Sequence, residues 1–485
     1  MTWRRIKFGT DGWRGVVAED FTFENVRYAA QGVADYLRDK EGGGALAVVG
    51  YDCRFASENF AQAAAEVLAA NGHRTLIFDR GSPTQVASWT VIDRHAAGAV
   101  VITASHNPWT DNGIKYKPET GSSAPPEVIK ELEQRINALI EKGGSTVRSA
   151  DGDGAHPKIE RYDPRPAYYA QIAKMVDLEA VKSAGLRLVH ETMHGSGFGY
   201  ITDLLKGGRT GVEEVHAERN PYFGGVNPEP IPPNMQETLD LMRKGGHDLC
   251  IATDGDADRV GIIDENGTFI TQLQVYALLM LYLFEVRGWR GPVVKTINMT
   301  SMADELAKEF GVEVYELPVG FKNVAPKMME TNAVLGGEES GGFGFQGHIP
   351  ERDGILAGLF IADMIVKRGK PLSAILAELE QRVGPHAYAR HDIHLPRETY
   401  DTDRERILET LKERQPRTVA GQDVARVRDD DGFKFYLADG SWVLLRTSGT
   451  EPLIRIYAEA ADANAVEDRL SALEEIVGVG GHGGG

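Results

Sequence analysis

Apolar strand-like runs alternate with helix-like runs from the start of the chain to about residue 370, and this alternation constrains the fold more than any other sequence feature. Ala45–Gly50 fits a buried strand, Ser57–Asn71 has helical spacing and ends at Asn-Gly, and Ala97–Ile102 fits another strand. Such a succession predicts parallel sheets covered by helices on both faces. Because 485 residues exceed one ordinary domain, we expect three or four domains.

Changes in composition and in the alternation of strands and helices indicate where these domains begin and end. The pattern resets in the Gly- and Pro-rich stretch 143–165, and a third α/β unit starts near Thr268. Near Gly384–Pro396 the chain changes to short strands and a charged helix. We therefore expect three tandem α/β domains with mixed or parallel sheets at 1–150, 160–265 and 266–383, a smaller α+β domain at 384–478 and a disordered tail at 479–485.

Charge and cysteine content limit the classes of binding partner that we expect. The formal net charge is −18, which argues against nucleic acid and anionic membrane surfaces, so Arg and Lys must gather locally to bind an anionic substrate. Cys53 and Cys250 lie far apart, without a CxxC or Cys/His cluster, so neither a disulfide framework nor a zinc site is expected. The longest apolar stretch, near Val275–Phe284, is too short to span a bilayer, and no signal peptide is visible. We expect a cytoplasmic protein.

Three apolar strands run directly into small, polar, glycine-marked loops. Ala99–Ile102 leads into Thr-Ala-Ser-His-Asn-Pro, Leu249–Thr253 into Asp-Gly-Asp-Ala-Asp-Arg, and Val334–Leu335 into Gly-Gly-Glu-Glu-Ser-Gly-Gly. In open α/β sheets, ligands lie beyond the carboxyl ends of strands. The three loops therefore predict three domains that face one cleft.

The acidic loop is the sharpest local signal. Asp254, Asp256 and Asp258 alternate with small residues, so a tight turn can direct all three carboxylates inward. Such oxygen ligands suit Mg²⁺ or Ca²⁺. An EF-hand is excluded because Arg259 stands where that loop requires glycine. We interpret the loop as a metal site rather than a solvated acidic turn.

The other loops are ambiguous in isolation. Ser105 at a strand end beside His106 could be a nucleophile, but Ser and Asn-Pro are ordinary turn formers. Lys115, in a predicted turn at Asp111–Lys115, could return to the same site, although a neutral Lys beside carboxylates is not expected. The segment His194–Gly199 is Gly-rich, but its spacing is not GxGxxG, which argues against a dinucleotide site.

Two further loops could bind a sugar phosphate. Arg446, Ser448 and Thr450 offer a guanidinium, hydroxyls and backbone N–H groups that suit a phosphate dianion, or they form an ordinary turn. Glu338 and Ser340 lie in a loop too acidic for phosphate; it suits sugar hydroxyls, or it is a solvated loop. Sequence alone does not decide between these alternatives.

Taken together and in this order, the loops resemble the α-D-phosphohexomutase superfamily, which includes phosphoglucomutases, phosphomannomutases and phosphoglucosamine mutases. The resemblance spans nearly the whole chain: FGTDGWRG at 8–15, TASHNP with NGIK, PYFGGVNPEPIPPN at 221–234, DGDADR, GEESGG and RTSGTEP. It implies a four-domain, heart-shaped molecule around a central cleft, in which three α/β domains carry the phosphoserine, metal and sugar loops and the C-terminal domain binds phosphate.

The resemblance also implies roles for individual residues. Ser105 looks like the phosphorylated serine, and one Mg²⁺ per chain would be held by its phosphoryl oxygen and by Asp254, Asp256 and Asp258. Lys115 or His106 would be the acid/base, with His348 and the poorly deprotonating Arg352 as lesser candidates. The residues expected to bind substrate are Arg14, Arg259, Glu338, Ser340, Arg446, Ser448 and Thr450.

The sugar loop favours glucose. Mannose-competent and glucosamine enzymes tend to have a His after Ser-Gly, where this chain has Gly342, and the segment His348–Gly354 is similar to the glucose enzymes. We expect a phosphoglucomutase activated by glucose 1,6-bisphosphate, acting on hexose phosphates as a monomer or weak dimer. The alternatives are a dual-specificity phosphomannomutase/phosphoglucomutase, a phosphoglucosamine mutase, a phosphopentomutase, and, from other classes, a sugar-phosphate phosphatase or a non-catalytic sugar-phosphate binding protein.

Overall fold

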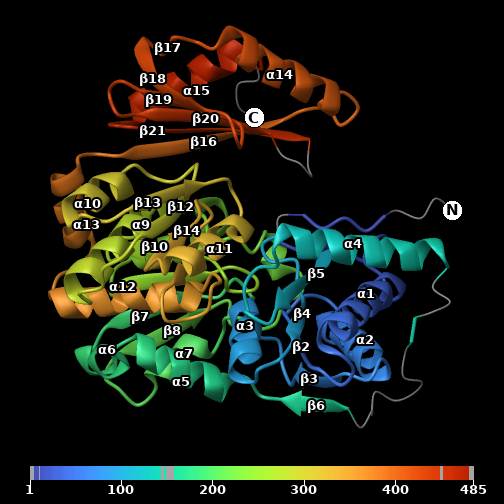
Figure 1. The fold of residues 1–485 in the computed structure, drawn as a ribbon. Coiled ribbons are helices and arrows are strands. Elements are labelled where there is room, and N and C mark those ends of the chain that lie inside the picture. The colour runs from blue at the N-terminus through green and yellow to red at the C-terminus, as the bar shows by residue number, and fades with distance from the viewer. Residues whose placement is uncertain (1–4, 10, 144–146, 149–157, 448–451, 480–485) are drawn as a thin grey trace.

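The chain folds around four sheets, each with its own helices, in a computed structural model that describes residues 5–9, 11–143, 147–148, 158–447 and 452–479. Three sheets lie together in the lower part of Figure 1, and the fourth, in red, lies above them. The expected tail, apart from Val479, is outside the described residues. No helix in the described part of the chain is long and apolar enough to cross a membrane.

The first sheet has six strands in the order β1-β5-β4-β2-β3-β6. Strands β4, β2, β3 and β6 are parallel to one another, as the alternation predicts, whereas β5 pairs antiparallel with β4 and β1. The elements of this domain are β1 (Trp13–Val16), α1 (Phe23–Glu41), β2 (Leu46–Tyr51), α2 (Ser57–Ala70), β3 (Arg74–Phe78), α3 (Thr84–Asp93), β4 (Gly98–Ile102), β5 (Asp111–Pro118), α4 (Pro126–Glu141) and β6 (Ile159–Tyr162).

Strand β5 corrects one prediction. The segment Asp111–Lys115 was expected to be a turn, but it is the first part of this strand. Asn112, Lys115 and Lys117 are polar and yet buried, because each finds a polar partner. Their polarity hides the strand from any pattern based on hydrophobicity.

The second sheet has the order β11-β10-β9-β7-β8 and the third has the order β13-β12-β14-β15. Their strands are β7 (Arg187–Glu191), β8 (Gly211–Val215), β9 (Leu249–Thr253), β10 (Val260–Asp264), β11 (Phe269–Ile270), β12 (Val293–Thr296), β13 (Val314–Leu317), β14 (Leu335–Gly337) and β15 (Phe343–Phe345). By pairing, β6 belongs to the first sheet and β11 to the second, although the sequence places them in the second and third domains.

Helices surround these two sheets. They are α5 (Arg165–Met175), α6 (Leu178–Ala184), α7 (Tyr200–Leu205), α8 (Gln236–Arg243), α9 (Gln272–Leu281), α10 (Met302–Phe310), α11 (Phe321–Thr331), α12 (Gly354–Arg368) and α13 (Leu372–Val383), with short 3₁₀ turns at Phe223–Gly225 and Pro232–Asn234 and a π turn at Tyr282–Val286. Helix α12 packs against β9 and β10 of the second sheet.

The fourth sheet is antiparallel, in the order β16-β21-β20-β19-β18-β17. Its elements are β16 (Ala387–His394), α14 (Tyr400–Arg414), β17 (Thr418–Val419), β18 (Gln422–Arg428), β19 (Phe433–Leu437), β20 (Trp442–Thr447), β21 (Leu453–Ala460) and α15 (Ala463–Val477). This is the α+β module that the change in sequence texture predicts.

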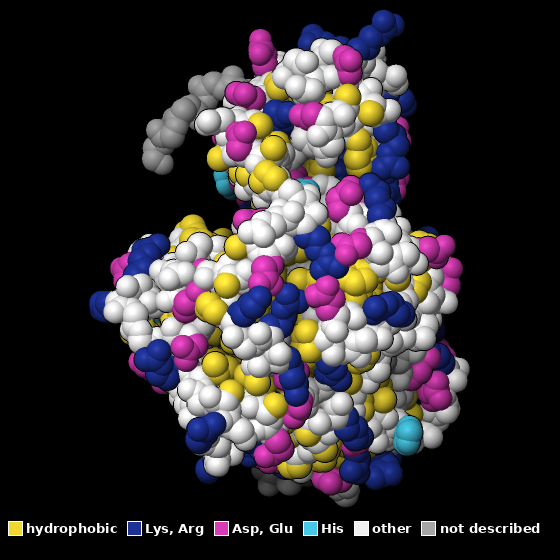
Figure 2. Space-filling view, turned by 90° about the vertical axis from the view of Figure 1, so that its left-hand side faces the viewer, with side chains coloured by type: hydrophobic (Ala, Val, Ile, Leu, Met, Phe, Trp, Pro, Cys, Tyr) yellow, Lys and Arg dark blue, Asp and Glu magenta, His cyan; other side chains and the backbone are white. Residues whose placement is uncertain are grey.

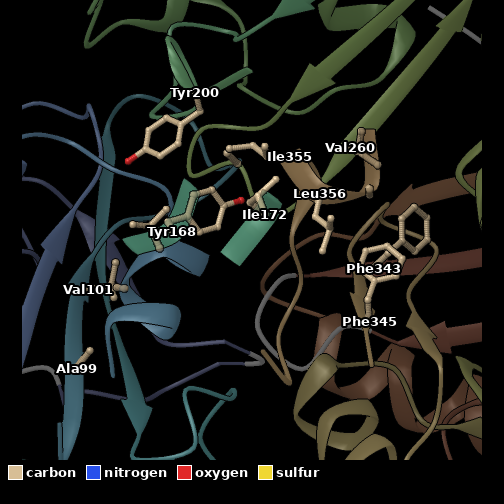
Figure 3. Close-up of a cluster of buried hydrophobic side chains, with 14 of the residues drawn as sticks. Ala99, Val101, Tyr168, Ile172, Tyr200, Val260, Phe343, Phe345, Ile355 and Leu356 are labelled. Carbon is tan, nitrogen blue, oxygen red and sulfur yellow. The ribbon is translucent and has the colours of Figure 1, made fainter. Parts of the chain in front are cut away.

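The buried apolar side chains divide unevenly among the domains. One continuous cluster runs through the first three domains, and Figure 3 shows part of it, from Val101 of the first sheet through Tyr168 and Ile355 to Phe343 of the third. The fourth domain has a core of its own, centred on side chains such as Phe435 and Leu470. Figure 2 shows this domain as an upper lobe above a narrower waist.

The seam between the third and fourth domains combines a small apolar cluster with buried polar groups. Glu459 accepts hydrogen bonds from the Ser301 amide at 2.8 Å and the Trp442 indole at 3.1 Å. Lys434 Nζ donates to the Ile297 carbonyl at 2.6 Å and pairs with Glu316 at 3.0 Å. Polar contacts therefore make up much of this junction.

Candidate active site

Ser105 lies in the turn between β4 and β5 and is 2% exposed. Its φ of 53° is in the left-handed region, which is uncommon for a residue other than glycine and is often found at functional sites. The Ser105 amide donates to Thr103 Oγ1 at 2.9 Å, and this bond helps to hold the turn. The turn therefore presents the serine hydroxyl in one defined position.

Arg54, which the sequence analysis did not single out, supports this turn from behind. Its buried guanidinium donates to four backbone carbonyls of the loop, those of Ser105 (2.5 Å), Asn107 (2.7 Å), Pro108 (2.8 Å) and Asp111 (3.0 Å). Asp52, 3.2 Å from Arg54 Nε, balances its charge. The sequence signal for this role was the pair Asp52 and Arg54 directly after the buried strand β2, since charged side chains that are buried require partners.

The three aspartates lie between β9 and β10 and are completely buried. Gly255 lets this loop approach the serine loop, because a Cβ atom there would lie 2.5 Å from the Ser105 carbonyl oxygen. Ser105 Oγ donates to Asp254 Oδ2 at 2.9 Å. The structure thus brings together two loops that are about 150 residues apart, as the sequence predicts.

The chemistry of the aspartate cluster fits a divalent cation. One carboxylate oxygen from each aspartate lies within 4.8 Å of the other two. Asp256 Oδ1 and Asp258 Oδ1 are buried without a hydrogen-bond partner among the described residues. Burial, together with repulsion from Asp256 and Asp258, raises the pKa of Asp254 well above its usual value. Buried carboxylate oxygens without hydrogen-bond partners suit a hard cation such as Mg²⁺.

Lys115 of β5 enters the same cluster. Its Nζ lies 2.8 Å from Asp11, 2.9 Å from Asp256 and 3.1 Å from Asp258. Burial disfavours its charge, but these three carboxylates outweigh burial and raise the pKa of Lys115. Lys115 is therefore a cation in this arrangement, in agreement with the expectation that it would not be neutral beside acidic groups.

His106 differs from Lys115 in its electrostatic surroundings. Its Nδ1 lies 3.4 Å from Ser105 Oγ. Burial, followed by the positive charges of Arg259, Arg14 and nearby cations, holds the pKa of His106 well below its usual value. The imidazole is therefore neutral beside the serine hydroxyl.

Arg14 and Arg259 lie close to the serine and aspartate loops. Arg14 of β1 donates to Asn107 Oδ1 at 2.6 Å, within the serine loop. The Arg259 amide donates to Asp254 Oδ1 at 3.1 Å, and its guanidinium pairs with Glu229 at 3.1 Å. Arg259 Nε is buried without a partner among the described residues. Both predicted substrate-binding arginines thus contact the serine and aspartate loops.

Glu338 is connected to the aspartate cluster by ion pairs of Arg352. Arg352 Nη1 lies 3.6 Å from Glu338, and Arg352 Nη2 lies 2.9 Å from Asp258 and also contacts Asp11. Burial raises the pKa of Glu338, and Arg352 opposes this rise. Arg352 thus joins the first three domains at the cluster. Ser340 is partly exposed two residues after Glu338, in the turn between β14 and β15.

His348, another of the acid/base candidates, makes its described contacts outside this cluster. Its side chain is fully buried, with Nε2 2.9 Å from Asp353 and the ring stacked 5.9 Å from that of Trp89. The same Asp353 accepts from the Tyr168 hydroxyl at 2.8 Å. Asp353 also caps α12 by accepting from the Leu356 amide at 2.9 Å. His348 therefore serves the packing of the domains.

The expected phosphate loop is only partly described. Ser448 and Thr450 lie outside the described residues. Arg446 at the end of β20 makes two hydrogen bonds to Asp431, at 2.9 and 3.1 Å. Asp431 also accepts from the Val319 amide of the third domain at 2.7 Å. A substrate phosphate at Arg446 would therefore compete with Asp431.

Asp11 is a second site residue that the sequence analysis did not single out. It lies inside the FGTDGWRG segment and contacts Lys115, Lys117 and Arg352. The cations at Lys115, Lys117 and Arg352 hold its pKa well below the usual value, although burial opposes them. A carboxylate in a glycine-rich segment before a strand was the only signal.

Family comparisons agree with this arrangement. Models of the phosphoglucomutase/phosphomannomutase α/β/α domains I, II and III match residues 5–142, 166–267 and 272–383, and the model of the C-terminal domain matches residues 406–476. All four matches follow the order of the sheets.

Individual relatives are similar over nearly the full length. A phosphoglucomutase/phosphomannomutase of Thermococcus kodakarensis is 32% identical, covering 96% of both chains. A probable phosphoglucosamine mutase of Methanopyrus kandleri is 32% identical over 97% of both, and a phosphoglucomutase of Komagataeibacter xylinus is 30% identical over 97% of this chain and 91% of its own. The crystal structure of a putative phosphomannomutase from Thermus thermophilus is 34% identical, with a TM-score of 0.85, covering 98% of this chain and all of that one.

Proposed function

Because this chain belongs to the phosphoglucomutase/phosphomannomutase family and is a phosphohexomutase, we propose that it interconverts glucose 1-phosphate and glucose 6-phosphate through a phosphoserine at Ser105. The observation that carries the assignment of the serine is the contact between Ser105 Oγ and Asp254 Oδ2 at 2.9 Å. A hydroxyl on the edge of a buried carboxylate cluster is placed where a cation would face its phosphoryl group.

In the proposed reaction, phospho-Ser105 transfers its phosphoryl group to the free hydroxyl of the bound hexose monophosphate. The bond from Ser105 Oγ to phosphorus breaks, a bond from the sugar oxygen to phosphorus forms, and the proton of the sugar hydroxyl passes by way of a base to the freed Ser105 Oγ. Glucose 1,6-bisphosphate results and turns over in the cleft. Ser105 Oγ then takes the other phosphoryl group, and its proton returns to the sugar oxygen that is released. Phosphoryl transfer of this kind depends mainly on positioning and on charge stabilisation.

Each residue near Ser105 would have a separate role in this phosphoryl transfer. A divalent cation, which we propose to be one Mg²⁺ held by Asp254, Asp256 and Asp258, supplies positive charge beside the transferred group when bound. His106, 3.4 Å from Ser105 Oγ, is the better placed proton acceptor, since Lys115 is engaged by three carboxylates. Lys115 and Arg259 add fixed positive charge.

The remaining site residues would bind the sugar and its second phosphate. The Glu338 carboxylate would accept hydrogen bonds from sugar hydroxyls, and the Ser340 hydroxyl would donate or accept them. Arg446, Ser448 and Thr450 would hold the phosphate that does not react. That phosphate supplies binding energy remote from the reacting atoms. Arg14 would contact the serine-side phosphoryl group, and domain closure would exclude water from phospho-Ser105.

Glucose is favoured over other hexoses by the sugar loop. A Cβ atom on Gly342 would lie 2.3 Å from Arg352 Cδ, so a side chain here would collide with the stem of Arg352. The histidine expected at this position in mannose and glucosamine enzymes would therefore require Arg352 to move. The relatives are named for glucose, mannose and glucosamine substrates, so the family by itself does not choose among them.

A coupled assay tests the proposal with glucose 1-phosphate, Mg²⁺ and a trace of glucose 1,6-bisphosphate as activator. Glucose 6-phosphate formation should be lost in Ser105→Ala and retained in Ser183→Ala, an exposed serine in the second domain. Mass spectrometry should find phosphate on Ser105. Release of inorganic phosphate without isomerisation would identify a phosphatase instead. Faster turnover of mannose 1-phosphate or glucosamine 1-phosphate would show that this other sugar phosphate is the preferred substrate.

A further inference from the structure

A cavity of about 360 Å³ lies between the first and second domains, outside the aspartate cluster. Its walls come from the loops after β2 and β3, from α5, and from the start of α7. Its lining includes Tyr51, Arg80, Tyr169, Phe198, Tyr200 and Arg219. The Gly-rich segment His194–Gly199, which the proposed reaction does not use, supplies part of this lining. The volume is within the range of small-molecule sites, roughly 300–1,000 Å³, and such sites favour domain interfaces.

The topology places this cavity beside the serine. Strands β4, β2 and β3 are neighbours and parallel, so their carboxyl ends share one edge of the sheet. Ser105 follows β4, and the cavity follows β2 and β3. Ligands of open α/β sheets bind along this edge. The cavity therefore occupies a second ligand position on the sheet that carries the serine.

The side chains of the lining indicate an anionic ligand with a flat ring. Glu58 is neutralised by Arg219 at 2.7 Å, and Asp52 is neutralised by Arg54 at 3.2 Å. Arg80, by contrast, is 46% exposed and has only a 3.3 Å contact of Nε with Asp79, which leaves both terminal nitrogens without a partner among the described residues. A guanidinium with two free terminal nitrogens suits a carboxylate or phosphate.

Aromatic rings provide the rest of the surface. Tyr169 and Tyr200 meet edge to face at 5.7 Å, and Phe198 is 36% exposed. Tyr200 is 2% exposed and packs behind Tyr169. Figure 3 shows its ring extending from the second domain toward the first. The exposed ring of Phe198 and the partly exposed ring of Tyr169, close to one unpaired guanidinium in the lining, favour stacking of an unsaturated ring over an inorganic anion.

Arg219 connects this cavity to the serine loop. It lines the cavity and donates to the carbonyls of Cys53 at 3.3 Å and Arg54 at 3.2 Å. The Arg54 guanidinium in turn donates to the Ser105 carbonyl at 2.5 Å. We propose that the cavity is a regulatory site for a small organic oxyanion with a flat ring, and that Arg219 and Arg54 transmit its occupancy to Ser105. The energetic coupling of two sites must be reciprocal.

Isothermal titration with defined probes tests the site. The probes are adenosine 5′-monophosphate for a phosphate and nicotinate for a carboxylate, with adenosine and inorganic phosphate as controls for the ring and the anion alone. At least one probe should bind, and Arg80→Ala should weaken it about tenfold or more, as expected for a lost charge-assisted hydrogen bond. Arg74→Ala, at the opposite end of β3, is the matched control and should bind normally.

A second measurement separates this cavity from the catalytic cleft. A probe in the cavity should bind Arg446→Ala as it binds the wild type, and should change the turnover of glucose 1-phosphate in the wild type but not in Arg80→Ala, whose basal turnover should be unchanged. Glucose 1-phosphate should change the affinity for the probe by the same factor that the probe changes the affinity for the sugar phosphate. Absence of binding by both probes, equal binding by Arg80→Ala, loss of binding in Arg446→Ala, or binding without any effect on turnover would each overturn the proposal.

Discussion

The guanidinium of Arg54 donates a 2.5 Å hydrogen bond to the carbonyl of Ser105, so an arginine from the end of β2 sets the position of the residue that we propose to be phosphorylated. Three more carbonyls of the same loop accept from this guanidinium. A lysine would keep the charge opposite Asp52 but could not reach all four oxygens.

Arg54→Lys should therefore lower kcat by about tenfold to a hundredfold, the effect expected when a reacting group shifts by about 1 Å. Steady-state kinetics with glucose 1-phosphate measure the loss. Arg74→Lys is the control, because Arg74 is exposed on β3 of the same domain. Unchanged kcat in Arg54→Lys would contradict the positioning role.

Mg²⁺ should stabilise the folded protein by neutralising the aspartate cluster. At a hundredfold excess over its Kd, the cation should add ~2.7 kcal/mol to the free energy of unfolding. Asp254→Asn should remove most of this increment, while Asp240→Asn, on the exposed face of α8, should retain it. Differential scanning fluorimetry with and without Mg²⁺ measures the effect, and an equal increment in Asp254→Asn would refute the assignment of this residue as a ligand.

Substitution of Gly342 should damage the site through Arg352. Even Gly342→Ala would bring a Cβ atom to 2.3 Å from the Arg352 stem, whose head group is held by Asp11 and Asp258. We expect kcat/KM for glucose 1-phosphate to fall about tenfold or more, as expected for disturbed positioning, and to fall further in Gly342→His. Gly43→Ala, where a Cβ atom meets nothing, is the control. Full activity of Gly342→His would disprove the steric argument.

The stability of the second domain should depend on pH through His216. Its hydrogen bond to Glu191, at 2.9 Å, is the main cause that raises the pKa of His216 from 6.5 to about 8, against a smaller effect of burial. The folded state therefore binds more protons than the unfolded state between these values. The stabilisation is fully present below pH 6.5 and is lost as pH rises through 8.

Since the His216 side chain is 34% exposed, screening reduces the loss to on the order of 1 kcal/mol. The difference in unfolding midpoint between wild type and His216→Gln should be larger at about pH 5.5 than at about pH 9. A difference that stays constant over this range would show that the pair does not titrate as stated.

Periodicity was sufficient to predict most of the α/β elements, because buried strands such as β4 are uniformly apolar and helices such as α2 end at clear stop signals. It failed at β5, whose buried lysines are neutralised by carboxylates from other domains. The roles of Arg54 and Asp11 depend on contacts between distant segments, which no local pattern records. The stacking contact of His348 with Trp89 likewise joins segments that are distant in sequence and belong to different domains.

The fourth domain has its own core, and its first strand pairs with its last: β16 lies beside β21, with Ala387 opposite Ala460. Within the described residues, this domain is covalently attached through one connection, which leaves α13 at Gly384. Because the fourth domain is joined through one connection, changes in the torsion angles of a few residues are enough to rotate it as a whole. The contacts along the seam with the third domain limit how far it can rotate. If the fourth domain binds a substrate phosphate as we propose, we expect a stiffer or shorter connection at Gly384 to slow the exchange of sugar phosphates without changing the side chains of the aspartate cluster.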